Sequence, residues 1–364
     1  MITTCDPDNF RGCLVGGAIG DALGYPVEFM TWEQIQERYG EAGIQAYDLK
    51  DGIAQISDDT QMTLFTANGL LVAATRNKGE KKFSKQTVKC IHKCYKDWLR
   101  TQGGHFDKTE SNPISWLYHV PELHDARAPG HTCIKNLLGY SYGTPEKPKN
   151  QSKGNGGVMR VAPIGLFFDS GIFDAKQIAY FGAEAAAITH GHDLGFIPAA
   201  ALVLIINKIV YSNYTGEHAL QQIVSDSVAQ SAELFDESQH WAAFAGIMKK
   251  AVELAYSNAD DFACLQQLGH GCVAEETLAI AVFCALRYQN DFEKAITVSV
   301  NHGGDSDSTG AVTGNILGAH LGYDSLPKKY LDHLELKDII LEIADDLCYG
   351  YITDNEAWDR KYSI

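Results

Sequence analysis

The sequence predicts an all-α protein, and three observations support this. Apolar residues recur at three- and four-residue spacing along most of the chain, which is the period of a helix with one buried face. Alternating apolar and polar residues, the pattern of a half-buried strand, are scarce. Glycines recur at every fourth position in two segments, so each set forms one stripe along a helix. No linker or tandem repeat divides the 364 residues, so we expect one domain over 1–364.

The spacing of apolar residues predicts individual helices. One helix begins near Asp59 and carries Leu64 and Leu71 on its apolar face, and another carries Val88 and Leu99. Residues 101–157 are rich in Gly, Pro, Asn, Lys and Tyr, so we expect long loops there with one short helix. Further helices are expected near residues 174–190, 194–212, 217–234, 238–257, 274–289, 291–301, 308–321 and 336–347.

Two glycine stripes are expected to lie near the centre of the molecule. A glycine inside a helix costs about 1 kcal/mol relative to alanine, and close approach of two backbones would offset that cost. If the stripes pack on one another, the acidic residues that flank them converge; the alternative is two separate contacts with unrelated partners. The stripes are Gly12, Gly16, Gly20 and Gly24, and Gly310, Gly314 and Gly318.

Composition limits the classes of function. Hydrophobic residues make up 45% of the chain, enough for a large core. The formal net charge of −16 makes direct nucleic-acid binding unfavourable, because such binders usually carry a basic patch. Met1–Asp6 lacks the basic and apolar regions of a signal peptide, and the longest apolar run, Phe196–Ile206, is too short to span a bilayer. We therefore expect a cytoplasmic protein that does not enter a membrane, and we favour a monomer.

The nine cysteines are an odd number. Cys90 and Cys94 are four residues apart, but no second closely spaced Cys or His pair completes a zinc site. The cysteines are therefore predicted to be free thiols in a reducing cytosol rather than a disulfide framework.

Two acidic segments carry the strongest chemical signal. They are Ser57–Thr60, which reads Ser-Asp-Asp-Thr, and 301–309, which contains Asp305 and Asp307. Carboxylates and hydroxyls are the ligands that Mg²⁺, Mn²⁺ and Ca²⁺ prefer, so together the segments would suit two hard cations. Each segment also has a structural interpretation. The first could be a helix N-cap with acids in its first turn, and the second a glycine-rich turn before an acidic cap.

Two further segments could contact a ligand. The glycine-rich stretch 154–157 precedes an apolar run, so its N–H groups could face a phosphate, with charge added by Arg160; a plain turn has the same pattern. Thr189–Asp193 joins two long helices. His192 is expected to satisfy carbonyls at a helix C-terminus, whereas His190 could hydrogen-bond a ligand; His302 is equally open.

Glu28 follows the first glycine stripe, between Val27 and Phe29. Burial would raise its pKa and nearby metals would lower it, which makes it a candidate general base. A surface glutamate after a turn is the alternative.

Taken in order, these motifs resemble the ADP-ribosylglycohydrolase family, which includes dinitrogenase-reductase-activating glycohydrolases and ADP-ribosyl-acceptor hydrolases. The resemblance extends from about residue 12 to residue 320. It implies a compact multi-helix orthogonal bundle around a binuclear Mg²⁺ or Mn²⁺ site. The matching segments are residues 16–24, 26–28, 57–62, 154–160, 189–190 and 303–308.

The resemblance also implies the roles of individual residues. Glu28, Asp58 and Asp307 would be catalytic, and Asp307 would bridge the two metals. Ser57 and Ser308 stand where many members have threonine, and serine retains the hydroxyl oxygen. One metal would be held by Ser57, Asp58, Asp59 and Asp307, and the other by Asp305, Asp307 and Ser308. The ADP-ribose cleft would be lined by Ser152, Gly154, Asn155, Gly156 and His190.

The implied reaction is hydrolysis of the N- or O-glycosidic bond at C1″ of the distal ribose, which releases ADP-ribose from a protein or small-molecule conjugate. Two alternatives stay open: a non-catalytic ADP-ribose binder or structural relative, and a binuclear-metal phosphatase or pyrophosphatase. The acceptor is also open, among arginine, serine, O-acetyl-ADP-ribose, nucleic acid and small molecules. Residues 101–151 match no motif and are expected to shape the acceptor side.

Overall fold

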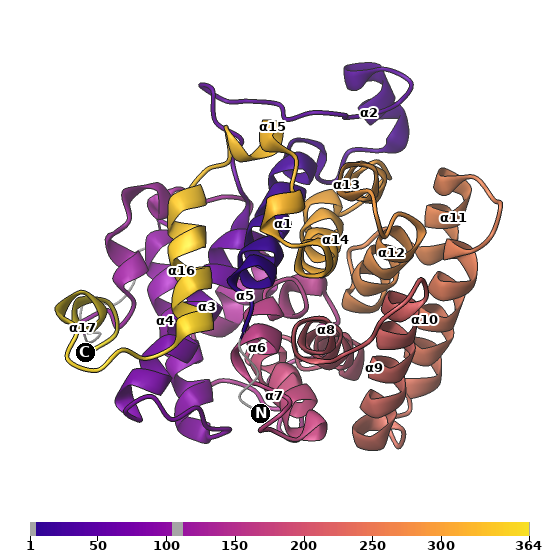
Figure 1. Ribbon diagram of the computed structural model, residues 1–364. Helices are drawn as coiled ribbons and strands as arrows, with labels where there is room; N and C mark the ends of the chain where they lie inside the picture. The colour runs from indigo at the N-terminus through magenta and orange to yellow at the C-terminus, as the bar shows by residue number, and fades with distance from the viewer. Residues whose placement is uncertain (1–4, 104–111, 364) are drawn as a thin grey trace.

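The computed structural model describes residues 5–103 and 112–363, and within these ranges all regular secondary structure is helical (Figure 1). The predicted all-α class is therefore confirmed. The α-helices are α1 (Pro7–Gly24), α2 (Trp32–Tyr39), α3 (Asp58–Arg76), α4 (Lys85–Thr101), α5 (His131–Leu137), α6 (Ala162–Phe167), α7 (Ala175–Ala187), α8 (Asp193–Tyr211), α9 (Ala219–Phe235), α10 (Trp241–Ala255), α11 (Asp261–Leu268), α12 (Ala274–Arg287), α13 (Phe292–Val300), α14 (Ser306–Leu321), α15 (Lys328–Leu331), α16 (Lys337–Tyr349) and α17 (Glu356–Tyr362).

Helices α1 and α14 lie side by side at the centre of the fold (Figure 1). Their glycine stripes face each other. A Cβ on Gly16 would lie under 3.0 Å from the Gly314 carbonyl oxygen. A Cβ on Gly20 would likewise lie under 3.0 Å from the Gly310 carbonyl oxygen. Residue numbers rise along α1 as they fall along α14, so the helices are antiparallel. The predicted convergence is confirmed. The end of α1 therefore lies beside the start of α14, where Asp305 and Asp307 are found.

The long helices were predicted within a few residues of their ends, and the short ones were missed. The predicted 217–234 corresponds to α9, and 308–321 to α14, which begins two residues earlier. The short helix expected within 101–157 is α5, whereas 104–111 of that stretch lie outside the described residues. The missed α2, α6, α11, α15 and α17 have at most eight residues each, too few for a periodic pattern to stand out.

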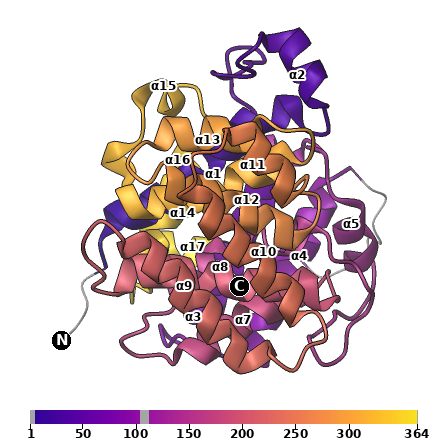
Figure 2. The same cartoon turned by 90° about the vertical axis from the view of Figure 1, so that its right-hand side faces the viewer.

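Helix α8 lies in the core. Among the helices that the structure describes, it is the one long and apolar enough to cross a membrane, but 83% of its apolar window is buried inside the protein. Helices α7, α9 and α12 pack around it (Figure 2). Burial on all sides explains a helix that is apolar all round.

The expectation of free thiols is wrong for two of the nine cysteines. Cys5 and Cys348 form a disulfide with a Cα–Cα distance of 6.0 Å, which joins the start of the chain to the end of α16. An odd total does not show which cysteines meet in space, and this pair is separated by 343 positions. The cytoplasmic location stays a prediction. The free thiols are Cys13, Cys90, Cys94, Cys133, Cys264, Cys272 and Cys284.

Candidate active site

One pocket of about 310 Å³ is lined by residues from all the segments that the sequence singled out. Ser57 and Ser152, both predicted site residues, do not line it; each accepts a hydrogen bond from the N–H of a lining residue, Asp59 and Gly154 respectively. The predicted residues that do line the pocket are Glu28, Asp58, Asp59, Gly154, Asn155, Gly156, His190, Asp305, Asp307 and Ser308.

The N-terminus of α3 carries both the cap and the acids. The Ser57 hydroxyl accepts a hydrogen bond from the Asp59 N–H at 3.2 Å, so the structural interpretation of this segment is correct. The same geometry directs Asp58 and Asp59 into the pocket. Asp21 was not among the predicted site residues. It is fully buried in α1 and accepts hydrogen bonds from the Ser57 N–H (3.0 Å) and the Thr60 N–H (3.1 Å). The one hint in the sequence was that Asp21, a charged residue, lies between the small residues Gly20 and Ala22 of a helix expected to be buried.

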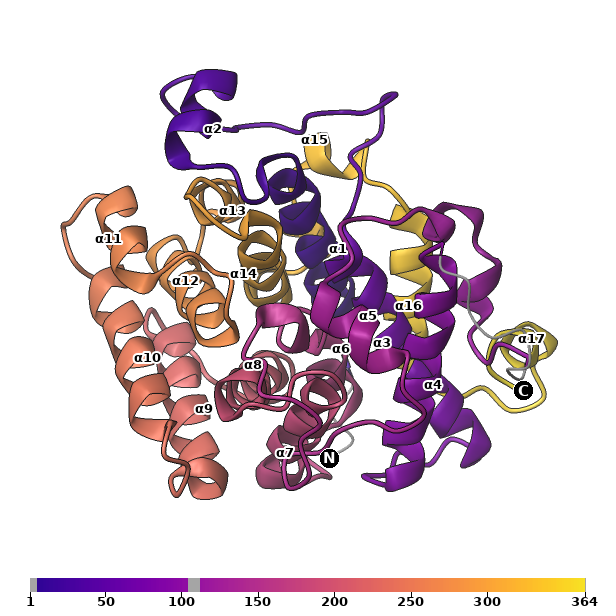
Figure 3. The same ribbon diagram turned by 180° about the vertical axis from the view of Figure 1, so that it is seen from behind.

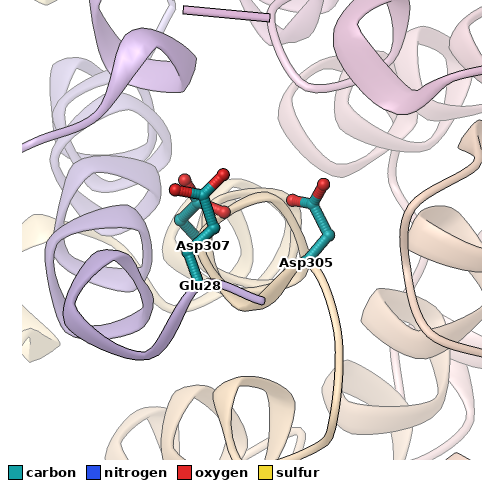
Figure 4. A group of neighbouring side chains, drawn as sticks. All are labelled: Glu28, Asp305 and Asp307. Carbon is teal, nitrogen blue, oxygen red and sulfur yellow. The ribbon is translucent and has the colours of Figure 1, made fainter. Parts of the chain in front are cut away.

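The start of α14 supplies the other two aspartates. Asp305 precedes the first turn, and its N–H donates to the His270 carbonyl at 2.9 Å. Asp307 lies within the first helical turn, because the helix begins at Ser306, two residues before the predicted start. Figure 4 shows both side chains at this helix end, with Glu28 reaching them from the segment after α1. One carboxylate oxygen from each of the three lies within 4.8 Å of the others.

Electrostatic repulsion dominates this pocket. Burial and the neighbouring carboxylates raise the pKa values of Asp58, Asp59 and Asp305 well above their usual range. Burial first, and then Asp307 and Asp305, raise the pKa of the half-buried Glu28 to about 10. Carboxyl groups this close cannot all ionise without compensation, so at neutral pH the cluster holds protons or cations.

The donor set fits a hard divalent cation. Every acidic donor is a carboxylate oxygen, the ligand type of Mg²⁺ and Mn²⁺. Asp59 Oδ2 is buried and has no hydrogen-bond partner among the described residues. Such an orphaned anionic oxygen would be costly unless a proton or a cation satisfied it.

The glycine-rich loop forms a short 3₁₀ turn, η4 (Asn155–Gly157). A Cβ on Gly156 would lie 2.8 Å from His190 Cε1, so any side chain at this position would displace the His190 ring. The Asn155 amide donates to the Gly271 carbonyl at 2.8 Å. The Ser152 hydroxyl accepts from the Gly154 N–H at 3.4 Å, which supports the loop from behind.

Arg160 does not line the pocket, but its positive charge acts on two residues that do: it helps to lower the pKa of His190 and opposes the rise in the pKa of Asp58. It is fully buried, and its guanidinium donates to the Thr189 hydroxyl (2.7 Å) and the Ala185 carbonyl (3.2 Å). Its side chain also stacks over Tyr95, 4.3 Å from the ring centroid. Arg160 lies in the core because the residues after it are apolar and buried. Its partners there are Tyr95 of α4 and two residues at and just after the end of α7.

The three histidines have different roles. His190 is buried at the pocket wall, and burial, together with Arg160, lowers its pKa to about 3, so its ring is neutral at pH 7. His192 is not at a helix C-terminus as expected; its Nδ1 accepts from the Leu194 N–H at 3.0 Å and caps the N-terminus of α8. His302 is buried, bonded to the Thr309 hydroxyl at 2.9 Å, and lies outside the pocket lining.

Comparison with known proteins decides the family. The family model described as ADP-ribosylglycohydrolase matches residues 3–357. The chain belongs to the ADP-ribosylglycohydrolase family. The resemblance that the motifs indicated is confirmed.

Relatives with known names match the chain over most of its length. ADP-ribosylhydrolase ARH3 of Homo sapiens is 23% identical, covering 90% of this chain and 89% of its own. The ADP-ribosyl-[dinitrogen reductase] glycohydrolase of Rhodospirillum rubrum is 26% identical, with 91% of each chain covered. A solved structure titled ADP-ribosylglycohydrolase-related protein complex has a TM-score of 0.64 at 23% identity, covering 94% of this chain and 98% of that one, and so shares its fold.

One wall of the pocket comes from a segment without a recognised motif, residues 128–133, which leads into the first turn of α5. The Gly130 N–H donates to Asp58 Oδ2 at 3.0 Å. Just before the loop, the Asp58 N–H donates to the Arg127 carbonyl at 3.0 Å, and the Arg127 guanidinium forms a buried ion pair with Glu335 at 2.9 Å. Nothing in the local sequence showed that this loop would orient Asp58, because Glu335 is more than 200 residues away.

Proposed function

We propose that this family member is a metal-dependent hydrolase that cleaves the glycosidic bond between ADP-ribose and an acceptor. Family membership supports a hydrolase acting on ADP-ribosyl conjugates. One structural observation carries the rest of the proposal: five carboxylates from three separate segments meet in one pocket, beside a glycine-rich turn and a neutral histidine. These carboxylates are Glu28, Asp58, Asp59, Asp305 and Asp307.

The proposed cofactor is a pair of Mg²⁺ or Mn²⁺ ions. Five carboxylates and two divalent cations leave a net charge near zero, which supports two ions rather than one. When bound, the cations would hold ribose hydroxyls and a water and favour ionisation of that water. The proposed ligands of one ion are Ser57, Asp58, Asp59 and Asp307, and those of the other are Asp305, Asp307 and Ser308, so that Asp307 is shared.

The chain's own residues bind and orient the conjugate. Gly154 and Gly156 line the pocket, and a glycine-rich turn of this kind suits a diphosphate. The neutral His190 ring can hydrogen-bond the substrate without adding charge. Glu28 takes the proton of the attacking water or relays one to the leaving group. The remaining carboxylates stabilise the positive charge that develops on the distal ribose as its bond to the acceptor breaks.

A panel assay tests the proposal. Purified protein with Mg²⁺ is incubated with ADP-ribosylated arginine, serine, nucleoside and O-acetyl conjugates, and free ADP-ribose is quantified. Release of intact ADP-ribose from at least one conjugate is expected. Release of phosphate or AMP instead would indicate a phosphatase or pyrophosphatase, and calorimetric binding of ADP-ribose without turnover of any conjugate would indicate a non-catalytic binder.

A further inference from the structure

Phe29 lines two cavities. One is the acidic pocket, and the other is a neighbouring cavity of about 490 Å³. The second cavity lies between the start of α2 and α11, the two elements that lie near each other at the edge of the molecule in Figure 3. A cavity of this size accommodates a ring-sized ligand.

Neither the backbone conformation nor the exposure of Phe29 stabilises the folded protein. Its backbone lies in the left-handed region, with φ of 57°, which is strained for a residue with a side chain. Its side chain is 63% exposed, although an aromatic ring is stabilised by burial. The Phe29 N–H donates to the Gly304 carbonyl at 2.8 Å, which fixes this arrangement directly beside Asp305. A strained, exposed ring next to reactive carboxylates indicates a ring that contacts a ligand.

The turn 270–272 connects the second cavity to the acidic pocket. Its Gly271 carbonyl accepts from the Asn155 amide, and its His270 carbonyl accepts from the Asp305 N–H. Burial and the fields of Asp305 and then Glu276 raise the pKa of the Cys272 thiol, which lines the second cavity, to about 11. A conjugate whose distal ribose lies at the carboxylates therefore has this cavity next to it for its leaving group.

The walls of the second cavity favour a flat ring. Trp32 is stacked on Phe262, with ring centroids 5.2 Å apart and an interplanar angle of 29°. Met30 and Phe29 add apolar surface, and the Gln266 amide can donate and accept at a ring edge.

The same walls do not favour a guanidinium. The acidic side chain in the cavity lining is that of Glu33, which is solvent-exposed; hydrogen bonds from its own N–H and from Thr31, at the start of α2, lower its pKa. An arginine acceptor would call for a carboxylate held inside the cavity for bidentate pairing. A serine side chain or an acetyl group would leave most of the cavity unfilled.

We propose that this cavity is the acceptor subsite, and that the acceptor is a nucleobase-sized heteroaromatic ring linked through a ring nitrogen. This rests on the proposed hydrolase function. In the reaction, the C1″–N bond breaks and its electron pair leaves with the ring. The water oxygen bonds to C1″, and the water proton passes to the ring nitrogen through Glu28. The net charge of −16 favours a free nucleoside or similar small molecule over a nucleic-acid strand.

The test compares wild type with Phe29→Ala on two conjugates, ADP-ribosyl-thymidine and ADP-ribosyl-arginine, by kcat/KM. Ile172→Ala, which also removes an exposed apolar side chain, is the matched control and is expected to behave as wild type. Loss of one stacking ring should lower kcat/KM for the thymidine conjugate about tenfold, mainly through KM. Because Phe29 also lines the acidic pocket, kcat/KM for the arginine conjugate should fall too, but by a clearly smaller factor. Trp32→Ala should show the same selectivity.

Equal losses on both conjugates, or a wild-type preference for the arginine conjugate, would overturn the acceptor assignment while leaving the hydrolase function in place. If no conjugate is hydrolysed, the proposed function fails. In that case calorimetry with free thymidine still decides the subsite: binding by wild type that Phe29→Ala weakens supports it, and absence of binding overturns it.

Discussion

Asp21 shows that a carboxylate can position a site without lining it. It is buried in α1 and accepts from the Ser57 and Thr60 N–H groups, so it fixes the first turn of α3 relative to the central helix pair. Burial and repulsion by Asp307 raise its pKa to about 7, which shows how closely it is linked to the acidic pocket.

Asp21→Asn is therefore expected to lower activity without unfolding the protein. An amide oxygen accepts more weakly than a carboxylate, so the α3 turn should become less well ordered. Loss of such a supporting contact typically costs 10–100-fold in metal affinity or activity. The measurement is kcat/KM together with the Mg²⁺ dependence of Tm. Asp345→Asn, which alters a half-exposed ion pair with Arg11, is the control; equal effects of the two substitutions would refute the positioning role.

Asp307→Ala tests the proposed shared ligand. Its carboxylate lies close to those of Glu28 and Asp305, so its removal relieves repulsion in the metal-free protein and removes an oxygen donor. We expect loss of detectable turnover and loss of Mg²⁺-linked thermal stabilisation. A variant that melts with the same Mg²⁺ dependence as wild type would show that Asp307 binds no cation.

At the scale of residues, the sequence predicted which carboxylates form the pocket better than it predicted the partners of individual side chains. The motifs identified which carboxylates meet, because two separate acidic segments next to glycine stripes are an unusual pattern. They did not predict that Arg160 would point into the core or that His192 would cap α8, because both depend on partners brought together only by the fold.

At the scale of elements, the α1–α14 contact determines whether the pocket forms. The backbones approach so closely that a Cβ on Gly314 would meet the Gly16 carbonyl at under 3.0 Å. Neither backbone can move without shifting a helix that carries site residues at its end.

Gly314→Ala is expected to destabilise the protein despite the higher helix propensity of alanine. The propensity gain is about 1 kcal/mol, whereas overpacking costs about 1–3 kcal/mol and more where backbone must move. Gly246→Ala is the matched control, since Gly246 lies in α10 with open space around it; it should raise the free energy of unfolding by up to about 1 kcal/mol. Denaturant unfolding of both variants checks this, and a stabilised Gly314→Ala would contradict the packing argument.

The helices themselves could be predicted where they are long. Periodicity identified α3, α4, α7 to α10, α12 to α14 and α16, which have nine or more residues each. The short α2 was not recognised, although Thr31 and Gln34 form a capping box at its start, and α2 is the element that completes the second cavity. The packing of α1 on α14 could be predicted only from the glycine stripes, because periodicity alone does not show which helices are in contact.

At the scale of the whole molecule, the proposed metal site would link stability to cations and protons. Chelation by EDTA should abolish release of ADP-ribose, and Mg²⁺ or Mn²⁺ should restore it. At about one hundred times Kd, a bound cation stabilises by about 2.7 kcal/mol. Full activity in EDTA would refute the metal role.

The same stabilisation should depend on pH. The pKa values of Asp21 and Glu28 are raised to about 7 and about 10, so the metal-free folded cluster retains protons that the unfolded chain loses as pH rises above about 4. These retained protons stabilise the metal-free folded state at low pH, and this part of the free energy of unfolding is lost as pH rises. Cations displace fewer protons at high pH, and the rise in Tm on adding Mg²⁺ should be larger at pH 8 than at pH 5. Thermal melts at both values, with Asp307→Ala alongside, check the sign.

The antiparallel α1–α14 pair also has a consequence during synthesis. The glycine face of α1 leaves the ribosome early, but the surface that covers it is made only when residues near 318 have been translated. At usual elongation rates this delay is on the order of tens of seconds. Throughout that interval α1 has no packing partner in the nascent chain. Chaperones that shield apolar segments would be expected to bind its exposed glycine face.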